Sequence, residues 1–341
     1  MTIRIVIVED SPFARAALRD SLEEEGDIEV VGMAEDGQAA LGVVRLHKPD
    51  LVTMDIQMAG ADGLTAIEQL MAHAPLPILV VTALPSGPDS NLTFEALRRG
   101  ALDVAAKPSG PARASQAARL RRQVRSLAGV PVVRHVGALR TAIRPVVAAV
   151  APTGRTPIVG IAASAGGPIA VAQVLAALPA RFPACIAIVQ HLPIGFAAFF
   201  ASFLRRSVLA EVVVASGDVE PRRGSVVIAP DDRHLVLTAA GSLSSTADPP
   251  VGGHRPSATV LFQSLARVAG ASAVGVILTG IGDDGAAGLL AMRQAGARTI
   301  AQDAKTSAVF GMPRAAIAAG AATSVLALED IAQALVSAVS R

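Results

Sequence analysis

Short apolar runs recur along the first part of the chain, and segments with helical character separate them. The runs lie at Ile3–Val8, Glu29–Ala34, Leu51–Met54, Pro77–Val81 and Leu102–Ala105. Helices are expected notably at Pro12–Glu25, Gly37–His47 and Ser90–Arg99. Strands that alternate with helices at this spacing predict a parallel sheet with helices on both faces. Five strands in a domain of this size indicate the flavodoxin-like doubly wound fold.

The same alternation resumes at Pro157 and continues toward the C-terminus. Apolar runs lie at Ile158–Ala162, Ala184–Gln190, Glu211–Val214, Val226–Ala229, Leu235–Thr238, Val274–Thr279 and Thr299–Ala301. Helices are expected at Ile169–Leu178, Phe196–Leu204, Ser257–Val268, Gly285–Ala295 and Glu329–Val339. We therefore expect a second doubly wound α/β domain with a mostly parallel sheet, in which 211–246 forms short strands and hairpins.

Turn-forming residues and arginines mark the segment between the two alternating regions. Nine arginines lie within 109–156, along with Gly-Pro, Arg-Pro and Pro-Thr-Gly sequences. The first third of this segment, Ala112–Leu127, has the character of a basic helix that completes the first domain. The domains expected are thus 1–125, a basic linker at 126–156, and 157–341.

The composition excludes several classes of protein. No run of about 18 apolar residues occurs, so no membrane insertion is expected. Cys185 is the one cysteine and lies in an apolar run, which fits a buried thiol in the reducing cytoplasm. The chain contains no Trp and no Tyr, so few rings are available for stacking single-stranded nucleic acid.

Charge is segregated along the chain although the net charge is only +2. Residues 1–103 hold 17 acids and 7 bases, residues 104–210 hold 13 bases and no acid, and residues 211–341 hold 10 bases and 11 acids. Such asymmetry bears on association rather than on fold. Attraction between the acidic and basic segments, or simple solubilisation of a linker, would each account for it.

Polar residues stand at the ends of the strands predicted for the first domain: Glu9, Asp10, Asp55, Thr82 and Lys107. The carboxyl ends of parallel strands meet at one edge of a sheet, where three carboxylates would repel one another without a cation. Hard oxygen ligands suit Mg²⁺, so we predict a metal site at Glu9, Asp10 and Asp55, with Asp55 as a phosphoacceptor. Lys107 would neutralise the phosphoryl oxygens and Thr82 would hydrogen-bond to them. Any one of these residues alone would read as an ordinary solvated side chain.

Ser164 follows the first strand of the second domain, in the segment Ser164-Ala165-Gly166-Gly167-Pro168. Between a strand end and a helix N-terminus, exposed N–H groups can receive an oxyanion, which makes Ser164 a candidate nucleophile. Capping of the helix is a second role for Ser164. A phosphate cradle is a third, although the G-x-G-x-x-G spacing and a P-loop lysine are absent. Ala162 stands where the α/β-hydrolase elbow G-x-S-x-G has its first Gly.

His191 and the pair Asp283-Asp284 follow two other predicted strands. A histidine there can act as a base, and a carboxylate on the Gly-rich loop 280–285 can orient its imidazole. A plain turn in which Asp284 caps the next helix is the alternative for this loop. Since Ser, His and Asp each follow a separate strand, together they favour a serine hydrolase whose order of residues differs from that of α/β-hydrolases.

The first domain resembles response-regulator receivers, down to Met54-Asp55-Ile56-Gln57-Met58 and Asp62-Gly63-Leu64. Ala59 replaces the usual Pro, and Val104 replaces an aromatic residue that often reports phosphorylation. The second domain resembles the catalytic domain of the chemotaxis protein-glutamate methylesterase family. The stretches that carry this resemblance are Gly160–Pro168, Gln190–Pro193, Val227–Pro230, Arg255–Ser257, Leu278–Gly285 and Ala301–Ala319, the last containing Val309-Phe310-Gly311-Met312-Pro313.

This resemblance implies a triad of Ser164, His191 and Asp284, rather than Asp283. Ala165 and Ile281 depart from the commoner Thr and Met of the family. The resemblance also implies that the protein hydrolyses glutamate methyl esters on methyl-accepting chemotaxis receptors and deamidates selected glutamines. Mg²⁺ would serve phosphorylation of the receiver by a chemotaxis histidine kinase, and the esterase step would need no cofactor.

The expected protein is thus a cytoplasmic monomer whose unphosphorylated receiver covers the hydrolase site. A DNA-binding response regulator that uses the arginine-rich middle is an alternative, but no helix-turn-helix is recognisable. A catalytically silent adaptor is a third hypothesis, which the presence of all three triad residues opposes.

Overall fold

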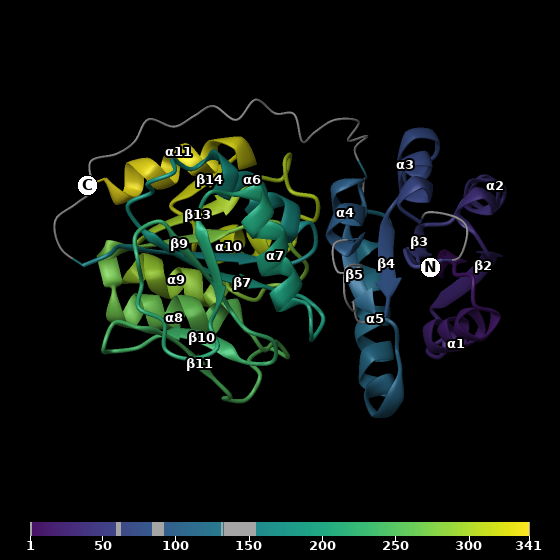
Figure 1. Ribbon diagram of the computed structural model, residues 1–341, viewed down its shortest axis with the longest axis horizontal. Helices are drawn as coiled ribbons and strands as arrows, with labels where there is room; N and C mark the ends of the chain where they lie inside the picture. Colours follow the sequence, from purple (N-terminus) through teal and green to yellow (C-terminus); the bar gives the residue numbers. More distant parts are fainter. Residues whose placement is uncertain (1, 59–62, 84–91, 131, 133–154, 341) are drawn as a thin grey trace. The chain divides into compact units, whose positions relative to one another are not determined.

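The computed structural model describes residues 2–58, 63–83, 92–130, 132 and 155–340. The chain forms two compact units, residues 1–139 and 140–341, coloured from purple to yellow in Figure 1. The predicted linker at 126–156 lies largely outside the described residues, so its boundaries stay a prediction. Within the described residues, no helix combines the length and apolar character that crossing a membrane requires.

The first unit contains a five-stranded parallel sheet in the order β2-β1-β3-β4-β5. Its strands are β1 Ile3–Val8, β2 Ile28–Ala34, β3 Leu51–Met54, β4 Ile78–Thr82 and β5 Asp103–Ala106. This order is that of the flavodoxin-like fold. The predicted fold of the first domain is confirmed, and β3 and β4 are buried along their whole length because helices flank the sheet.

Five α-helices accompany this sheet in the described residues: α1 Pro12–Glu23, α2 Gly37–His47, α3 Gly63–His73, α4 Leu92–Arg98 and α5 Arg113–Leu127. Side chains cap two of the N-termini, since the Ser11 hydroxyl accepts from the Ala14 N–H and the Asp36 carboxylate accepts from the Ala39 N–H. A short 3₁₀ turn, Gly110–Ala112, leads into α5.

Helix α5, which carries part of the basic segment, bonds through its arginines to acids of the first unit. The guanidinium of Arg121 is nearly buried and donates to the Ser21 carbonyl at 2.6 Å, to Glu24 at 2.5 Å and to Glu25 at 2.9 Å. Arg125 pairs with Glu25 and with Asp27. The basic helix therefore neutralises part of the acidic unit to which it belongs, and residues 1–130 together hold 17 acids and 13 bases.

The second unit contains a seven-stranded parallel sheet in the order β14-β13-β12-β6-β7-β9-β8. Its strands are β6 Ile158–Ala163, β7 Cys185–Gln190, β8 Glu211–Val214, β9 Ser225–Ile228, β12 Ala273–Ile277, β13 Arg298–Gln302 and β14 Ser324–Leu326. An antiparallel pair, β10 His234–Leu237 and β11 Leu243–Thr246, forms a separate small sheet. The prediction of a second α/β domain with a mostly parallel sheet is confirmed.

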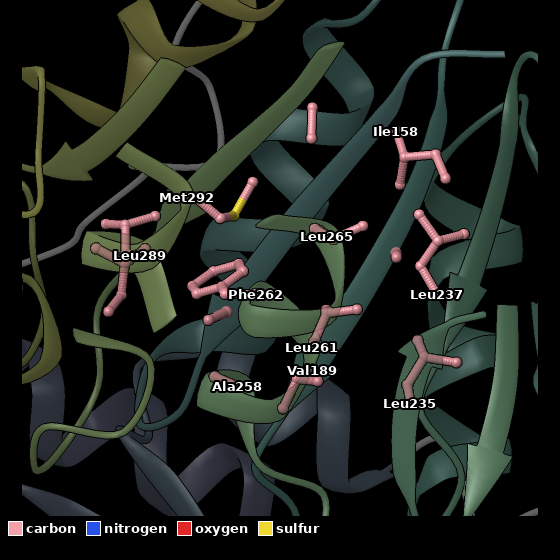
Figure 2. Packing of buried hydrophobic residues seen from close by; sticks show 14 of the residues in the cluster. Ile158, Val189, Leu235, Leu237, Ala258, Leu261, Phe262, Leu265, Leu289 and Met292 are labelled. Atoms are coloured by element: carbon pink, nitrogen blue, oxygen red, sulfur yellow. The ribbon is translucent and has the colours of Figure 1, made fainter. Parts of the chain in front are cut away.

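Six α-helices are described in the second unit: α6 Gly167–Ala177, α7 Ala197–Ser207, α8 Ala258–Val268, α9 Ala286–Gln294, α10 Met312–Ala318 and α11 Leu328–Val339. Helix α6 contacts α7 and α11, whereas α8 contacts α9, which contacts α10. A 3₁₀ turn, Gly270–Ser272, follows α8. Figure 2 shows Phe262 and Leu265 of α8 in one apolar core with Leu289 and Met292 of α9.

The strand order decides which loops can share a site. Strand β6 lies between β12 and β7, and all three run parallel. The loops after these strands carry Ser164, His191 and the segment 278–285, so all three emerge at the same edge of the sheet.

Candidate functional sites

A carboxylate and lysine cluster lies at the carboxyl edge of the first sheet. The Lys107 ammonium is 2.7 Å from Glu9 Oε2 and 2.6 Å from Asp55 Oδ2. Both carboxylates are buried, and the Gln57 N–H donates to the other oxygen of Asp55 at 3.1 Å. The structure thus brings these three predicted residues into direct contact.

The acids of this cluster can together hold a divalent cation. Ligand oxygens of Glu9, Asp10 and Asp55 all lie within 4.8 Å of one another. Burial raises the pKa of Glu9, against the effect of its hydrogen bond with Lys107. A cation among three carboxylate groups offsets this cost of burying negative charge, and an all-oxygen donor set suits Mg²⁺. The residues present fit the predicted metal.

Two further residues hydrogen-bond to the main chain of residues in the cluster. Thr82, at the end of β4, is buried and its carbonyl accepts from the Lys107 N–H at 2.9 Å, while the role predicted for its hydroxyl stays a prediction. Arg15, which the sequence analysis did not single out, donates from its guanidinium to the Glu9 carbonyl at 2.5 Å. Its position one helical turn after Ser11, the N-cap of α1, was the available signal.

Ser164 stands at the end of β6 in a closely packed turn. Its N–H donates to the Thr279 carbonyl at 3.0 Å, and the Gly167 N–H donates to its carbonyl at 2.8 Å. Gly166 has φ +72°, and a Cβ on Gly280 would lie 2.8 Å from Ser164 Cβ, so both positions need glycine. No side chain caps α6, which makes the alternative of Ser164 as a helix cap wrong.

The carboxylate of Asp284 lies between the His191 ring and the first turn of α8. Its Oδ2 is 2.9 Å from His191 Nε2 and accepts from the Ala258 N–H at 2.7 Å. Its Oδ1 accepts from the Ser257 hydroxyl at 2.8 Å and from the Thr259 N–H at 3.0 Å. Asp284 therefore caps α8 from a distant loop, and not the helix α9 that follows it, as one alternative had it.

These contacts keep the Asp284 carboxylate charged. Burial acts to raise its pKa, but hydrogen bonds from His191, from Ser257 and from the Ala258 N–H hold the pKa well below its usual value. The neighbouring Asp283 is exposed and makes none of these contacts. The structure thus places Asp284, rather than Asp283, against His191.

The other nitrogen of His191 has no hydrogen-bond partner among the described residues. This atom, Nδ1, is buried, and Ser164 Oγ does not reach it in this structure. The ring of His254 stacks on the His191 ring with centroids 4.2 Å apart and planes 8° from parallel. His254 fixes the plane of the imidazole, and the sequence offered no signal for it beyond its place in a Gly-Gly-His turn.

Gln190, like Arg15 and His254, was not predicted as a site residue. It ends β7, and its amide nitrogen donates to the Ser164 carbonyl at 2.8 Å and to the His191 carbonyl at 3.0 Å. A Cβ on Gly167 would lie only 2.2 Å from the Gln190 amide oxygen. One buried amide therefore links the two loops that carry the serine and the histidine. A polar residue at the end of an otherwise apolar strand was the signal.

Together these features define a class of protein: a receiver-type unit with an acid and lysine cluster, joined to a parallel α/β unit with a buried Ser, His and Asp at one sheet edge. Residues 5–119 match the model of the response regulator receiver domain, and residues 159–335 match that of the CheB methylesterase. The chain belongs to the CheB methylesterase family.

Similar proteins cover the whole chain. It is 45% identical to protein-glutamate methylesterase/protein-glutamine glutaminase 3 of Anaeromyxobacter dehalogenans, an alignment that covers 98% of each chain. It is 41% identical to the enzyme of the same name numbered 4 from Myxococcus xanthus, over 98% of this chain and 97% of the other. The crystal structure of the Thermotoga maritima CheB methylesterase catalytic domain is 34% identical with a TM-score of 0.52, and covers 54% of this chain and 99% of that one. The family resemblance is confirmed.

Proposed function

We propose that this protein hydrolyses glutamate methyl esters on methyl-accepting chemotaxis receptors, and that phosphorylation of Asp55 controls this activity. The observation that carries the proposal is the contact of His191 with a charged, buried Asp284, next to Ser164, in a chain of the CheB methylesterase family. Deamidation of selected glutamines would use the same acyl-transfer site.

The geometry supports a definite route for the proton. Because Nε2 of His191 donates to Asp284, Nδ1 is the ring atom that can take the Ser164 proton as Oγ attacks the ester carbonyl. As the tetrahedral intermediate collapses, the imidazolium gives this proton to the departing methoxy oxygen, which leaves as methanol, or to the amide nitrogen of a glutamine, which leaves as ammonia. Water attacks the acyl-enzyme in the reverse sequence, and the glutamate and the free serine are regenerated.

Main-chain groups next to Ser164 are suited to the oxyanion. The N–H groups of Ala165 and Gly166 donate to no backbone or side-chain acceptor among the described residues, and they precede the N-terminus of α6. Two such donors and the positive end of a helix stabilise the negative charge that develops on the carbonyl oxygen. No metal is required for this step.

The receiver cluster supports control by phosphorylation. Glu9, Asp10 and Asp55 would hold Mg²⁺, which supplies positive charge at the phosphoryl oxygens when bound. Lys107 reaches Asp55 already and would neutralise a phosphoryl oxygen in its place, and Thr82 would hydrogen-bond to another. A chemotaxis histidine kinase is the expected donor.

The alternative of a DNA-binding regulator loses its main support. Five of the nine arginines in the basic middle lie in α5, where Arg121 and Arg125 pair with acids of the receiver. Residues 159–335 match the CheB methylesterase model.

Methanol release from methylated receptor tests the proposed function. Ser164→Ala should lower turnover by roughly 10⁴- to 10⁶-fold and His191→Ala comparably, because the nucleophile or its base is lost. Asp284→Asn should be less severe, and Asp283→Asn should stay close to wild type. Retention of more than about a tenth of the activity in Ser164→Ala, against this expected loss, rules out Ser164 as the nucleophile.

A further inference from the structure

The first turn of α8 acts as the cradle for Asp284. The Ser257 hydroxyl and the N–H groups of Ala258 and Thr259 all donate to its two carboxylate oxygens. In return, the Thr259 hydroxyl accepts from the Gly285 N–H at 2.9 Å. The direction in which Asp284 faces His191 is therefore set by where α8 begins.

A fully buried histidine holds that beginning in place. His234, the first residue of β10, has no exposed surface, and its Nδ1 accepts from the Ser257 N–H at 3.1 Å. Its Nε2 lies 3.1 Å from the Pro249 carbonyl. Since Nδ1 accepts from an amide, the ring proton is on Nε2 and is donated to that carbonyl. The tautomer of His234 is thus fixed by two main-chain groups of opposite polarity.

We propose that His234 is a positioning residue of the hydrolase site, acting through Ser257 on the orientation of Asp284. This inference rests on the proposed function of Asp284 as the partner of His191. Without an acceptor at the Nδ1 position, a buried Ser257 N–H would lose its partner, which is costly enough to displace the start of a helix. The Ser257 hydroxyl and the next two N–H groups would move with it, and Asp284 would no longer be aimed at His191.

An effect of His234 on general packing between β10 and α8 has to be distinguished from an effect on Asp284. The structure offers a control for such packing. The Leu237 N–H of β10 donates to the Ser264 hydroxyl of α8 at 2.9 Å. This bond joins the same two elements and is equally buried, but it lies further along α8 from Asp284. Ser264→Ala therefore measures the cost of loosening the two elements without disturbing the cradle.

Two substitutions at His234 separate the acceptor from the bulk of the ring. His234→Asn keeps an oxygen near the place of Nδ1, whereas His234→Gln places its amide near Nε2 and leaves Ser257 without an acceptor. We expect kcat for methanol release to fall in His234→Gln by roughly 10- to 100-fold, with KM within about twofold, because displaced catalytic groups act on the chemical step. His234→Asn should recover most of kcat, and Ser264→Ala should lower the melting temperature while kcat stays near wild type.

The activities are compared per active serine, counted with a fluorophosphonate label, so that unfolded molecules do not enter. Equal losses in the Asn and Gln variants, an unchanged kcat in His234→Gln, or the same loss in Ser264→Ala would each overturn the proposal. Should His234→Gln not fold, His234→Leu gives the decision, because it too leaves the Ser257 N–H without an acceptor, and an unchanged kcat there overturns the proposal. A failure of the proposed function is distinguished by Ser164→Ala, which would then retain activity whatever the His234 variants do.

Discussion

At the scale of single residues, the candidate site depends on one carboxylate kept charged in a buried place. Asp284 has four hydrogen-bond donors around it, and only one of them, His191, belongs to the proposed chemistry. The other three come from Ser257, the N-cap of α8, and from the first two residues of that helix. The carboxylate therefore stabilises the fold as well as orienting the imidazole, and the two roles can be measured separately.

Asp284 should contribute to stability over a defined range of pH. Its pKa in the folded protein lies below the value of about 3.9 for an unfolded aspartate, so its contribution is complete above pH 4 to 5 and is lost as pH falls toward the folded value. We expect Asp284→Asn to destabilise the second unit by on the order of 2 kcal/mol at pH 7. Urea unfolding should give the same difference in the free energy of unfolding between wild type and Asp284→Asn at pH 7 and at pH 5, and a smaller difference at pH 3.5. If the difference in the free energy of unfolding instead widens as the pH falls, the pKa of Asp284 is not lowered in the folded protein.

At the scale of elements, apolar runs predicted most strands well because parallel strands are buried on both faces. β1, β3 and α2 begin and end at the predicted residues. α10 and β14 were missed because α10 has only seven residues and β14 only three, of which two are exposed, so neither gives a run long enough to read. For the same reason β11, with a single apolar residue, was foreseen only as part of a hairpin region.

The candidate site was predictable to the same extent. Ser164, His191 and Asp284 follow buried strands, and strand ends can be found from the sequence. Which strands are neighbours cannot be found that way, and neither can contacts made across the fold. His254 lies 63 residues after His191, on which its ring stacks, and His234 lies 50 residues before Asp284, which it supports through Ser257, so no local pattern reveals them.

A buried arginine in the middle of α5 gives a test at this scale. Arg121 of α5 is buried against α1, whereas Arg122, the next residue, is exposed. We expect Arg121→Ala to destabilise the first unit by about 1–3 kcal/mol, because a buried side chain and its bonds to Ser21 and Glu24 are lost, and Arg122→Ala to change it by less than about 0.5 kcal/mol. Urea unfolding combined with hydrogen exchange in α1 and α5 measures both. Similar values for the two variants would show that the Arg121 contacts contribute little.

At the scale of the whole molecule, the receiver cluster should respond to a small phosphodonor. With Mg²⁺ and acetyl phosphate, Asp55 should gain one acid-labile, hydroxylamine-sensitive phosphoryl group, and methanol release should rise. Asp10→Ala should slow the reaction by weakening the metal site, and Asp55→Asn should abolish it. Undiminished phosphate in Asp55→Asn, seen by intact mass, would place the acceptor elsewhere.

Charge gives the last prediction, on how the two units communicate. Residues 1–130 carry 17 acids and 13 bases, a net charge of −4, so the remaining residues carry +6. This asymmetry is smaller than the −10 of residues 1–103 suggests, since Lys107 and the five arginines of α5 belong to the first unit. Opposite net charges still favour association of the units, and several weak pairs, each about 0–1 kcal/mol, could together supply the few kcal/mol that a switch needs.

If attraction of this kind keeps the unphosphorylated receiver over the hydrolase site, basal methanol release by the full chain should rise with ionic strength, because salt screens exposed charges beyond a Debye length of about 8–10 Å. A fragment of residues 157–341 should start at a higher rate and show little increase. Sodium chloride between about 0.05 and 0.5 M covers the range over which screening changes most for such pairs. Parallel salt responses in the two proteins would exclude the electrostatic contribution and leave apolar contact between the units as the remaining means of control.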